Sequence, residues 1–266
     1  MTTKIIELEK PKLNDPIFVE GLPGVGNVGR IAAGYLAEEI GAKKFAELYS
    51  SHFMPFVLLH QSSAVHVLKN EFYYWKAKER GQRDLIILIG DSQRVDPDGH
   101  YEIVEAILDF VAKFGVKDMF TLAGLGVGEK SATPKIIGAV SEPELIKKYG
   151  KFDIDFDAGS KVGTIAGASG LLIGLGKLRG IRGICLLGET VGYPLLPDPK
   201  SAEAVLRVLA KVLNVKIDTT KLDKKAKEMD EFMKKVDEVQ RRALGQLMKP
   251  PTADVKAEKD KLSYIG

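Results

Sequence analysis

Cysteine is almost absent from this chain of 266 residues, which contains only Cys185. A single cysteine excludes a disulfide framework and a cysteine-based metal site. Long apolar runs are also missing, because the most apolar stretch, Val162–Leu178, is broken by glycines and by Lys177. The amino-terminal segment MTTKIIELEKPKLNDP lacks the apolar core of a secretory signal. We therefore expect a cytoplasmic protein without a membrane span.

A strong charge of either sign is absent as well. The chain has 39 basic and 36 acidic residues, a formal net charge of +3. This balance argues against a dedicated nucleic-acid or membrane surface. Hydrophobic residues make up 45% of the chain, and the mean hydropathy is −0.04, which suffices for a sizeable buried core.

Common catalytic and metal-binding motifs are missing too. The sequence contains no G-x-x-x-x-G-K-[ST], no G-x-S-x-G and no H-E-x-x-H, and its four histidines form no i, i+4 pair. Asp91 and Glu189 follow apolar strands, where α/β enzymes place acids and bases, but helix capping and loop ion pairs explain these positions equally well. We identify no catalytic residue, no metal site and no cofactor from the sequence.

The pattern that is present alternates short β-rich runs with longer helical ones. The spacing predicts helices at Val28–Glu39, Tyr101–Phe114, Pro143–Tyr149 and Ser201–Leu213. It predicts strands at Ile17–Glu20, Phe45–Tyr49, Phe56–His60, Val65–Lys69, Phe72–Lys76, Leu85–Ile89, Met119–Ala123 and Ile184–Leu187. This alternation indicates an α/β fold with a parallel or mixed central sheet and helices on both faces. We expect an antiparallel insertion or edge within residues 48–76.

Two glycine-rich loops follow predicted strands. In GLPGVGNVGR, Gly24, Gly26 and Gly29 match G-x-G-x-x-G between a strand and a helix, and Asn27 lies among them. The second loop, AGLGVGEKSATP, contains Gly124, Gly126 and Gly128. Both loops could line a nucleotide or small-molecule crevice, or serve only tight turns and close packing. Pro23 is foreign to the usual dinucleotide fingerprint, so we favour the packing interpretation.

The sequence after residue 217 differs in character. Residues that are apolar, with the exception of Gln240, recur there at alternating spacings of four and three, which predicts a helix over residues 218–248 with a narrow seam: Leu222, Ala226, Met229, Met233, Val236, Gln240, Ala243 and Leu247. Pro250 and Pro251 stop this helix. The seam suits either packing on the α/β core of residues 1–217 or an oligomer contact.

Residues 249–266 are mostly polar, which predicts a flexible tail. The tail ends in an apolar tip, with Leu262, Tyr264 and Ile265 before Gly266. A mobile tether with an apolar tip is typical of a docking peptide.

Several blocks, in order from about residue 15 to residue 247, carry a family resemblance. They are FVEGLPGVGNVGRIAAGYL, LIILIGDSQ, TLAGLGVGE, GASGLLIGLG and GETVGYPLLPDPKSAEAVLRVLAKVLNVKID. Together they resemble the archaeal branch of the proteasome assembly chaperone family. The resemblance implies a three-layer core similar to nucleoside-phosphorylase folds. It also implies a non-enzymatic homo-oligomeric chaperone or adaptor, a tetramer or pentamer, that binds proteasome α subunits or another family member.

The resemblance further implies a docking tripeptide of the form hydrophobic-Tyr-X. Here Tyr264 is third from the end and Ile265 is penultimate, so the motif is shifted by one residue. Ile265 cannot make the hydrogen bond of a tyrosine hydroxyl, which weakens each tail by about 1 kcal/mol. The alternative function is a small-molecule or nucleotide-binding enzyme that uses a crevice formed by the glycine loops, Asp91 and Glu189.

Overall fold

The computed structural model describes residues 2–59, 63–93, 97–128, 131, 133–157, 162–193, 196–224 and 227. Nearly all of these residues belong to one compact unit, residues 1–224, and the fold is given for that unit. The predicted helix from residue 228 onward and the whole tail lie outside the described residues.

Ten described strands and six bounded helical segments make up this unit, and residues 220–224 are also helical. The strands are β1 (Thr3–Glu7), β2 (Ile17–Gly21), β3 (Lys43–Ser50), β4 (Val57–Leu59), β5 (Val65–Val67), β6 (Asn70–Trp75), β7 (Leu85–Gly90), β8 (Asp118–Gly126), β9 (Ile136–Val140) and β10 (Arg182–Thr190). The helical segments are the 3-10 turn η1 (Val25–Asn27), α1 (Val28–Ile40), α2 (Pro97–Ala112), α3 (Glu144–Tyr149), α5 (Ala168–Leu178) and α6 (Pro199–Leu213).

Eight strands form one mixed sheet in the order β1-β3-β6-β7-β2-β8-β10-β9. The central strands β7, β2, β8 and β10 run parallel, and the outer strands pair antiparallel. Strands β4 and β5 form a separate antiparallel hairpin between β3 and β6. The predicted mixed sheet and the antiparallel insertion are both confirmed.

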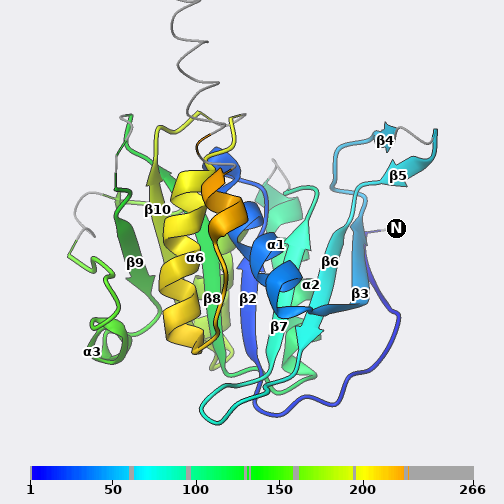
Figure 1. The fold of residues 1–266 in the computed structure, drawn as a ribbon. Helices are drawn as coiled ribbons and strands as arrows, with labels where there is room; N and C mark the ends of the chain where they lie inside the picture. Colours follow the sequence, from blue (N-terminus) through cyan, green and yellow to red (C-terminus); the bar gives the residue numbers. More distant parts are fainter. Residues whose placement is uncertain are drawn as a thin grey trace, which may run out of the picture. The chain divides into compact units, whose positions relative to one another are not determined.

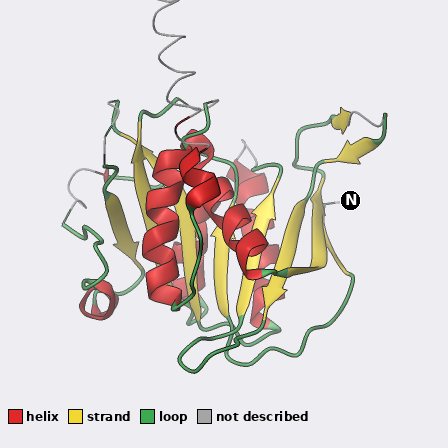
Figure 2. Cartoon of the chain, in the orientation of Figure 1, coloured by secondary structure: helices red, strands yellow, loops and turns green. Residues whose placement is uncertain are grey.

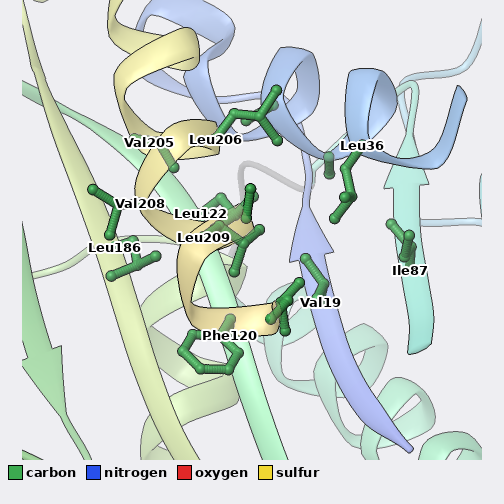
Figure 3. Close-up of a cluster of buried hydrophobic side chains, with 14 of the residues drawn as sticks. Val19, Leu36, Ile87, Phe120, Leu122, Leu186, Val205, Leu206, Val208 and Leu209 are labelled. Carbon is green, nitrogen blue, oxygen red and sulfur yellow. The ribbon is translucent and has the colours of Figure 1, made fainter. Parts of the chain in front are cut away.

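Helices cover both faces of the sheet (Figures 1 and 2). Helices α1 and α6 pack on one face, and α2 and α5 pack on the other. Neighbouring residues of β2 therefore enter different cores: Val19 belongs to the cluster that contains Leu36 and Leu206 (Figure 3), whereas Phe18 belongs to the cluster of α2 and α5. A strand buried on both faces must be almost wholly apolar, as β2, β7 and β8 are. The predicted three-layer α/β class is confirmed.

Two edge strands were not predicted. Strand β1 is mostly exposed and lacks the apolar run of a central strand. Strand β9 is apolar, but it is only five residues long and contains Gly138, a residue type that is depleted in strands. The glycine-rich stretch 163–181 contains α5. A Cβ atom added to Gly176 would lie 2.3 Å from Cε of Met119, so the helix packs closely on β8 there.

Candidate functional site

A groove of about 650 Å³ opens at the carboxyl ends of β2, β7 and β8. This is the edge where open α/β sheets place their ligand sites. The groove is lined by the turn between β2 and α1, by the loop after β7 and by the start of α5. Its lining includes the predicted site residues Gly24, Asn27, Gly29, Asp91 and Gly124.

The first glycine loop packs directly on the centre of the sheet. A Cβ atom on Gly29 would lie 2.0 Å from the carbonyl oxygen of Leu122, and one on Gly124 would lie 2.3 Å from that of Val25. Gly26 and Asn27 have φ values of 62° and 50°, in the left-handed region that glycine and asparagine tolerate best. Close packing and turn geometry thus account for these residues without a ligand.

Asp198 holds the same loop from the other side. Its amide donates to the carbonyl of Gly26 at 2.7 Å, and its carboxylate accepts hydrogen bonds from the Thr190 hydroxyl at 2.7 Å and the Ser201 amide at 2.9 Å. Asp198 therefore caps the amino terminus of α6 and fixes η1 in place. Asp198 is not among the residues predicted from the sequence, although the string Asp-Pro before a helical pattern is a typical helix start.

Gln93 crosses the groove. Its Nε2 donates to the carbonyl of Pro23 at 2.5 Å, and its Oε1 accepts from the amide of Ala168, the first residue of α5, at 3.0 Å. A helix amino terminus attracts anions through its free amides. Here the Gln93 side chain takes one of those amides.

Asp91 forms a charged cluster at the rim of the groove. Its carboxylate lies 3.2 Å from Nη2 of Arg30 and 2.5 Å from Nε2 of His66, and it also accepts from the amide of Lys69 at 3.3 Å. These contacts join α1 and the β4–β5 hairpin to the loop after β7. Asp91 thus has partners of its own within the fold.

Glu20 is a buried carboxyl group beneath the groove, which the sequence reasoning did not select. It accepts hydrogen bonds from the Leu22 amide at 2.9 Å and the Ser169 hydroxyl at 3.0 Å. Burial raises the pKa of Glu20 from 4.5 to about 7, although these hydrogen bonds oppose the shift. The signal in the sequence is an acidic residue within an apolar strand, IFVEG.

The surroundings of Glu20 are sealed from solvent. Thr121 donates a hydrogen bond to the carbonyl of Ser169 at 3.0 Å. The thiol of Cys185 is also buried, and this burial raises its pKa to about 12. Glu20, Ser169 and Thr121 are all buried. The serine and the carboxyl group therefore bond to each other inside the core and stabilise the contact between β2 and α5.

The remaining predicted crevice residues lie elsewhere. Glu189 accepts from the amide of Lys135 at 3.1 Å and so joins β10 to the start of β9. Gly126 lies against Gly192, Gly26 is buried beside Thr190, and Gly128 has a φ of +76° beyond the end of β8. The structure thus brings together only part of the predicted crevice.

The described part of the carboxyl-terminal segment joins the core. Leu222 is 1% exposed and packs in the cluster of α1 and α6, and the Tyr35 hydroxyl donates to the carbonyl of Asp218 at 2.8 Å. The other proposed seam and tail residues lie outside the described residues: Met229, Met233, Val236, Leu247, Leu262, Tyr264, Ile265 and Gly266. Within the described ranges, no helix is long and apolar enough to cross a membrane, and no three His, Cys, Asp or Glu side chains cluster as metal ligands would.

The fold and the groove thus place the chain in the class of three-layer α/β proteins, and here the Gln93 side chain spans the groove at the strand ends. The chain belongs to the PAC2 family, whose model matches residues 18–237.

Similar proteins extend over most of the chain. A structure of Pyrococcus furiosus PbaB, described as an archaeal proteasome activator, is 46% identical, with a TM-score of 0.84 over 89% of this chain and 99% of that one. P. furiosus PbaA, described as an archaeal homolog of proteasome-assembly chaperone, is 29% identical, with a TM-score of 0.70 over 91% of this chain and 99% of that one. An uncharacterized protein of Methanocaldococcus jannaschii, MJ1210, is 36% identical over 100% of this chain and 97% of its own length.

Proposed function

We propose that this chain is a non-enzymatic, homo-oligomeric adaptor of the proteasome, of the assembly-chaperone or activator class, working in the cytoplasm. Residues 262–266 contact proteasome α subunits, and the α/β core presents several such tails at once. Several tails on one oligomer raise the effective concentration of each, which offsets a weak individual contact.

The similarity to PbaB is the observation that carries this proposal. At 46% identity, covering 99% of PbaB, the two chains share the architecture of the whole folded unit. The similarity to PbaA, at 29% identity, points to the same functional class.

The geometry of the groove supports an adaptor over an enzyme. Asp91 is engaged by Arg30 and His66, Gln93 bonds across the groove, and Glu20 is sealed below it. An enzyme needs an acid, base or nucleophile within reach of a substrate. These three groups instead hold elements of the fold together.

Native mass spectrometry of the full chain mixed with archaeal proteasome α subunits tests the tail. We expect a complex with the full chain and none with a chain ending at Lys249, while both keep the same oligomeric mass. Ile265→Tyr places a tyrosine at the penultimate position and should tighten the complex about fivefold, the equivalent of one hydrogen bond of about 1 kcal/mol.

Lys259→Ala serves as the matched control, because it changes the polar part of the tail and leaves the apolar tip intact. It should bind α subunits as the unaltered chain does. Equal α-subunit binding by the full and shortened chains would refute the role of the tail.

A further inference from the structure

The segment around the β4–β5 hairpin concentrates the exposed apolar surface of the described residues. Of the 14 large hydrophobic side chains that are exposed, seven lie between Met54 and Val67. Residues 51–68 also contain no Asp, Glu, Lys or Arg, although 28% of the chain is charged and 28% of 18 residues is about five. An apolar, uncharged strip of this kind marks an interaction surface or an aggregation site.

The register of the hairpin gives its two faces opposite characters. Val57 pairs with Val67 and Leu59 pairs with Val65, so these four side chains share one face, and they are 49%, 54%, 73% and 67% exposed in that order. Leu58, which is 42% exposed, pairs with His66 on the other face, where His66 contacts Asp91 of the main body. The His66 contact ties that face to the body, so the face of the four more exposed apolar side chains points away from it.

The hairpin is held firmly at its base. Phe53 and Leu68, which flank it, are buried in the cluster of α2 and α5. The hairpin continues from β3 and β6 beyond the main sheet (Figure 1), and β4 and β5 pair only with each other. A two-stranded hairpin is marginally stable in water by itself. An anchored hairpin with a bare apolar face is therefore built to be covered by a partner.

The absence of charge favours a second copy of this chain as that partner. In a two-fold contact the same patch meets itself, so any charged residue near the axis would face its own like charge. The four-residue face of Val57, Leu59, Val65 and Val67 has no such conflict. Exposure of this apolar surface to water is unfavourable, and a second copy of the chain is available to cover it wherever the protein is made.

We propose that this face of the β4–β5 hairpin is a self-association surface, which packs against the same face of a second copy. The inference rests on the homo-oligomer of the proposed function and assigns one of its contacts.

The test introduces like charges on the exposed face of the full chain. Leu59→Lys with Val65→Lys should lower the oligomeric mass in sedimentation velocity and native mass spectrometry, with a rise of at least about 100-fold in the dissociation constant of that contact. Leu178→Lys is the matched control, because Leu178 is 81% exposed on α5 and undergoes the same chemical change away from the hairpin. Far-ultraviolet circular dichroism should be the same for all three proteins, since the altered side chains are exposed.

Charge complementation then tests whether hairpin meets hairpin. A second protein with Leu59→Glu and Val65→Glu should also lose mass by itself. Mixing the lysine and glutamate proteins should restore the larger species, because opposite charges then meet across the contact.

The inference alone would be overturned if the lysine variant kept the oligomeric mass of the unaltered chain, even if that variant lost α-subunit binding. It would also be overturned if mixing the lysine and glutamate proteins did not restore the larger species. A monomeric unaltered chain would overturn both this inference and the proposed homo-oligomer. An oligomer that depends on the hairpin but ignores α subunits would refute proteasome docking and leave the inference standing.

Discussion

Glu20 and Glu47 lie on the same sheet and have opposite pKa shifts. Burial raises the pKa of Glu20 to about 7. Hydrogen bonds from Lys44 and Lys69 lower the pKa of Glu47 to about 2. The difference arises because β2 is covered on both faces, whereas Glu47 lies on β3 within reach of two lysines.

The raised pKa of Glu20 predicts a particular dependence of stability on pH. Between pH 4.5 and about 7 the unfolded chain releases this proton while the folded chain keeps it, so the free energy of unfolding falls as pH rises. The total loss is about 3 kcal/mol at 1.4 kcal/mol per pKa unit. Glu20→Gln should remove this decline and stabilise the protein at pH 8, measured by urea unfolding from pH 5 to pH 8.

Glu47→Gln is the control with the opposite sign. The lowered pKa of Glu47 means that its charge stabilises the fold above about pH 4.5, and that this contribution is lost as pH falls towards 2. The substitution should therefore lower stability at pH 7. Parallel pH profiles for Glu20→Gln and the unaltered chain would show that the Glu20 carboxyl ionises normally in the fold.

At the scale of elements, the turn from β2 to α1 contains one glycine that has no room for a side chain and another that has room for one. Gly29 leaves no room for a Cβ atom beside the Leu122 carbonyl, whereas a Cβ on Gly24 would lie 3.7 Å from Nε2 of Gln93, an ordinary contact. Gly24 also has an extended backbone, with a φ of −167°.

Gly29→Ala should destabilise the protein by about 1–3 kcal/mol through overpacking. Gly24→Ala should change stability by less than about 0.5 kcal/mol. Thermal and urea unfolding of the two variants measure the difference. Equal losses at both positions would mean that the loop is governed by its turn and not by its contact with β8.

The prediction of elements from the sequence succeeded where local pattern and burial coincide. Leu85–Gly90 and Arg182–Thr190 are strands between two cores, so their apolar runs reveal them. The exposed edge strand Thr3–Glu7 has no such run. Glu20 was missed because its partner Ser169 is 149 residues away, and Asp91 was placed at a strand end without its link to His66. Such contacts depend on sheet order, which periodicity does not encode.

At the scale of the whole molecule, the compact unit of residues 1–224 includes Leu222. Leu222 was predicted as a seam residue, and it fills a place among the residues of α1 and α6. One neighbour, Lys221, is exposed and lies 3.9 Å from Glu39.

Leu222→Ala in the full chain should lower the free energy of unfolding by roughly 2–4 kcal/mol, the usual effect of truncating a buried leucine. Lys221→Ala should change it by less than about 0.5 kcal/mol. Urea unfolding at several protein concentrations separates this loss from any effect on assembly. A loss that vanishes on dilution would assign Leu222 to contacts between chains.

The place of β2 in the sheet also has a consequence for synthesis on the ribosome. Strand β2 pairs with β7 on one side and β8 on the other, and β8 ends at residue 126. The strands of residues 3–90 can assemble first, and the backbone hydrogen-bonding groups on one edge of the apolar strand β2 stay unpaired until β8 has emerged. Slow translation between residues 90 and 126 would prolong that exposure, so this stretch is where the nascent chain most needs protection.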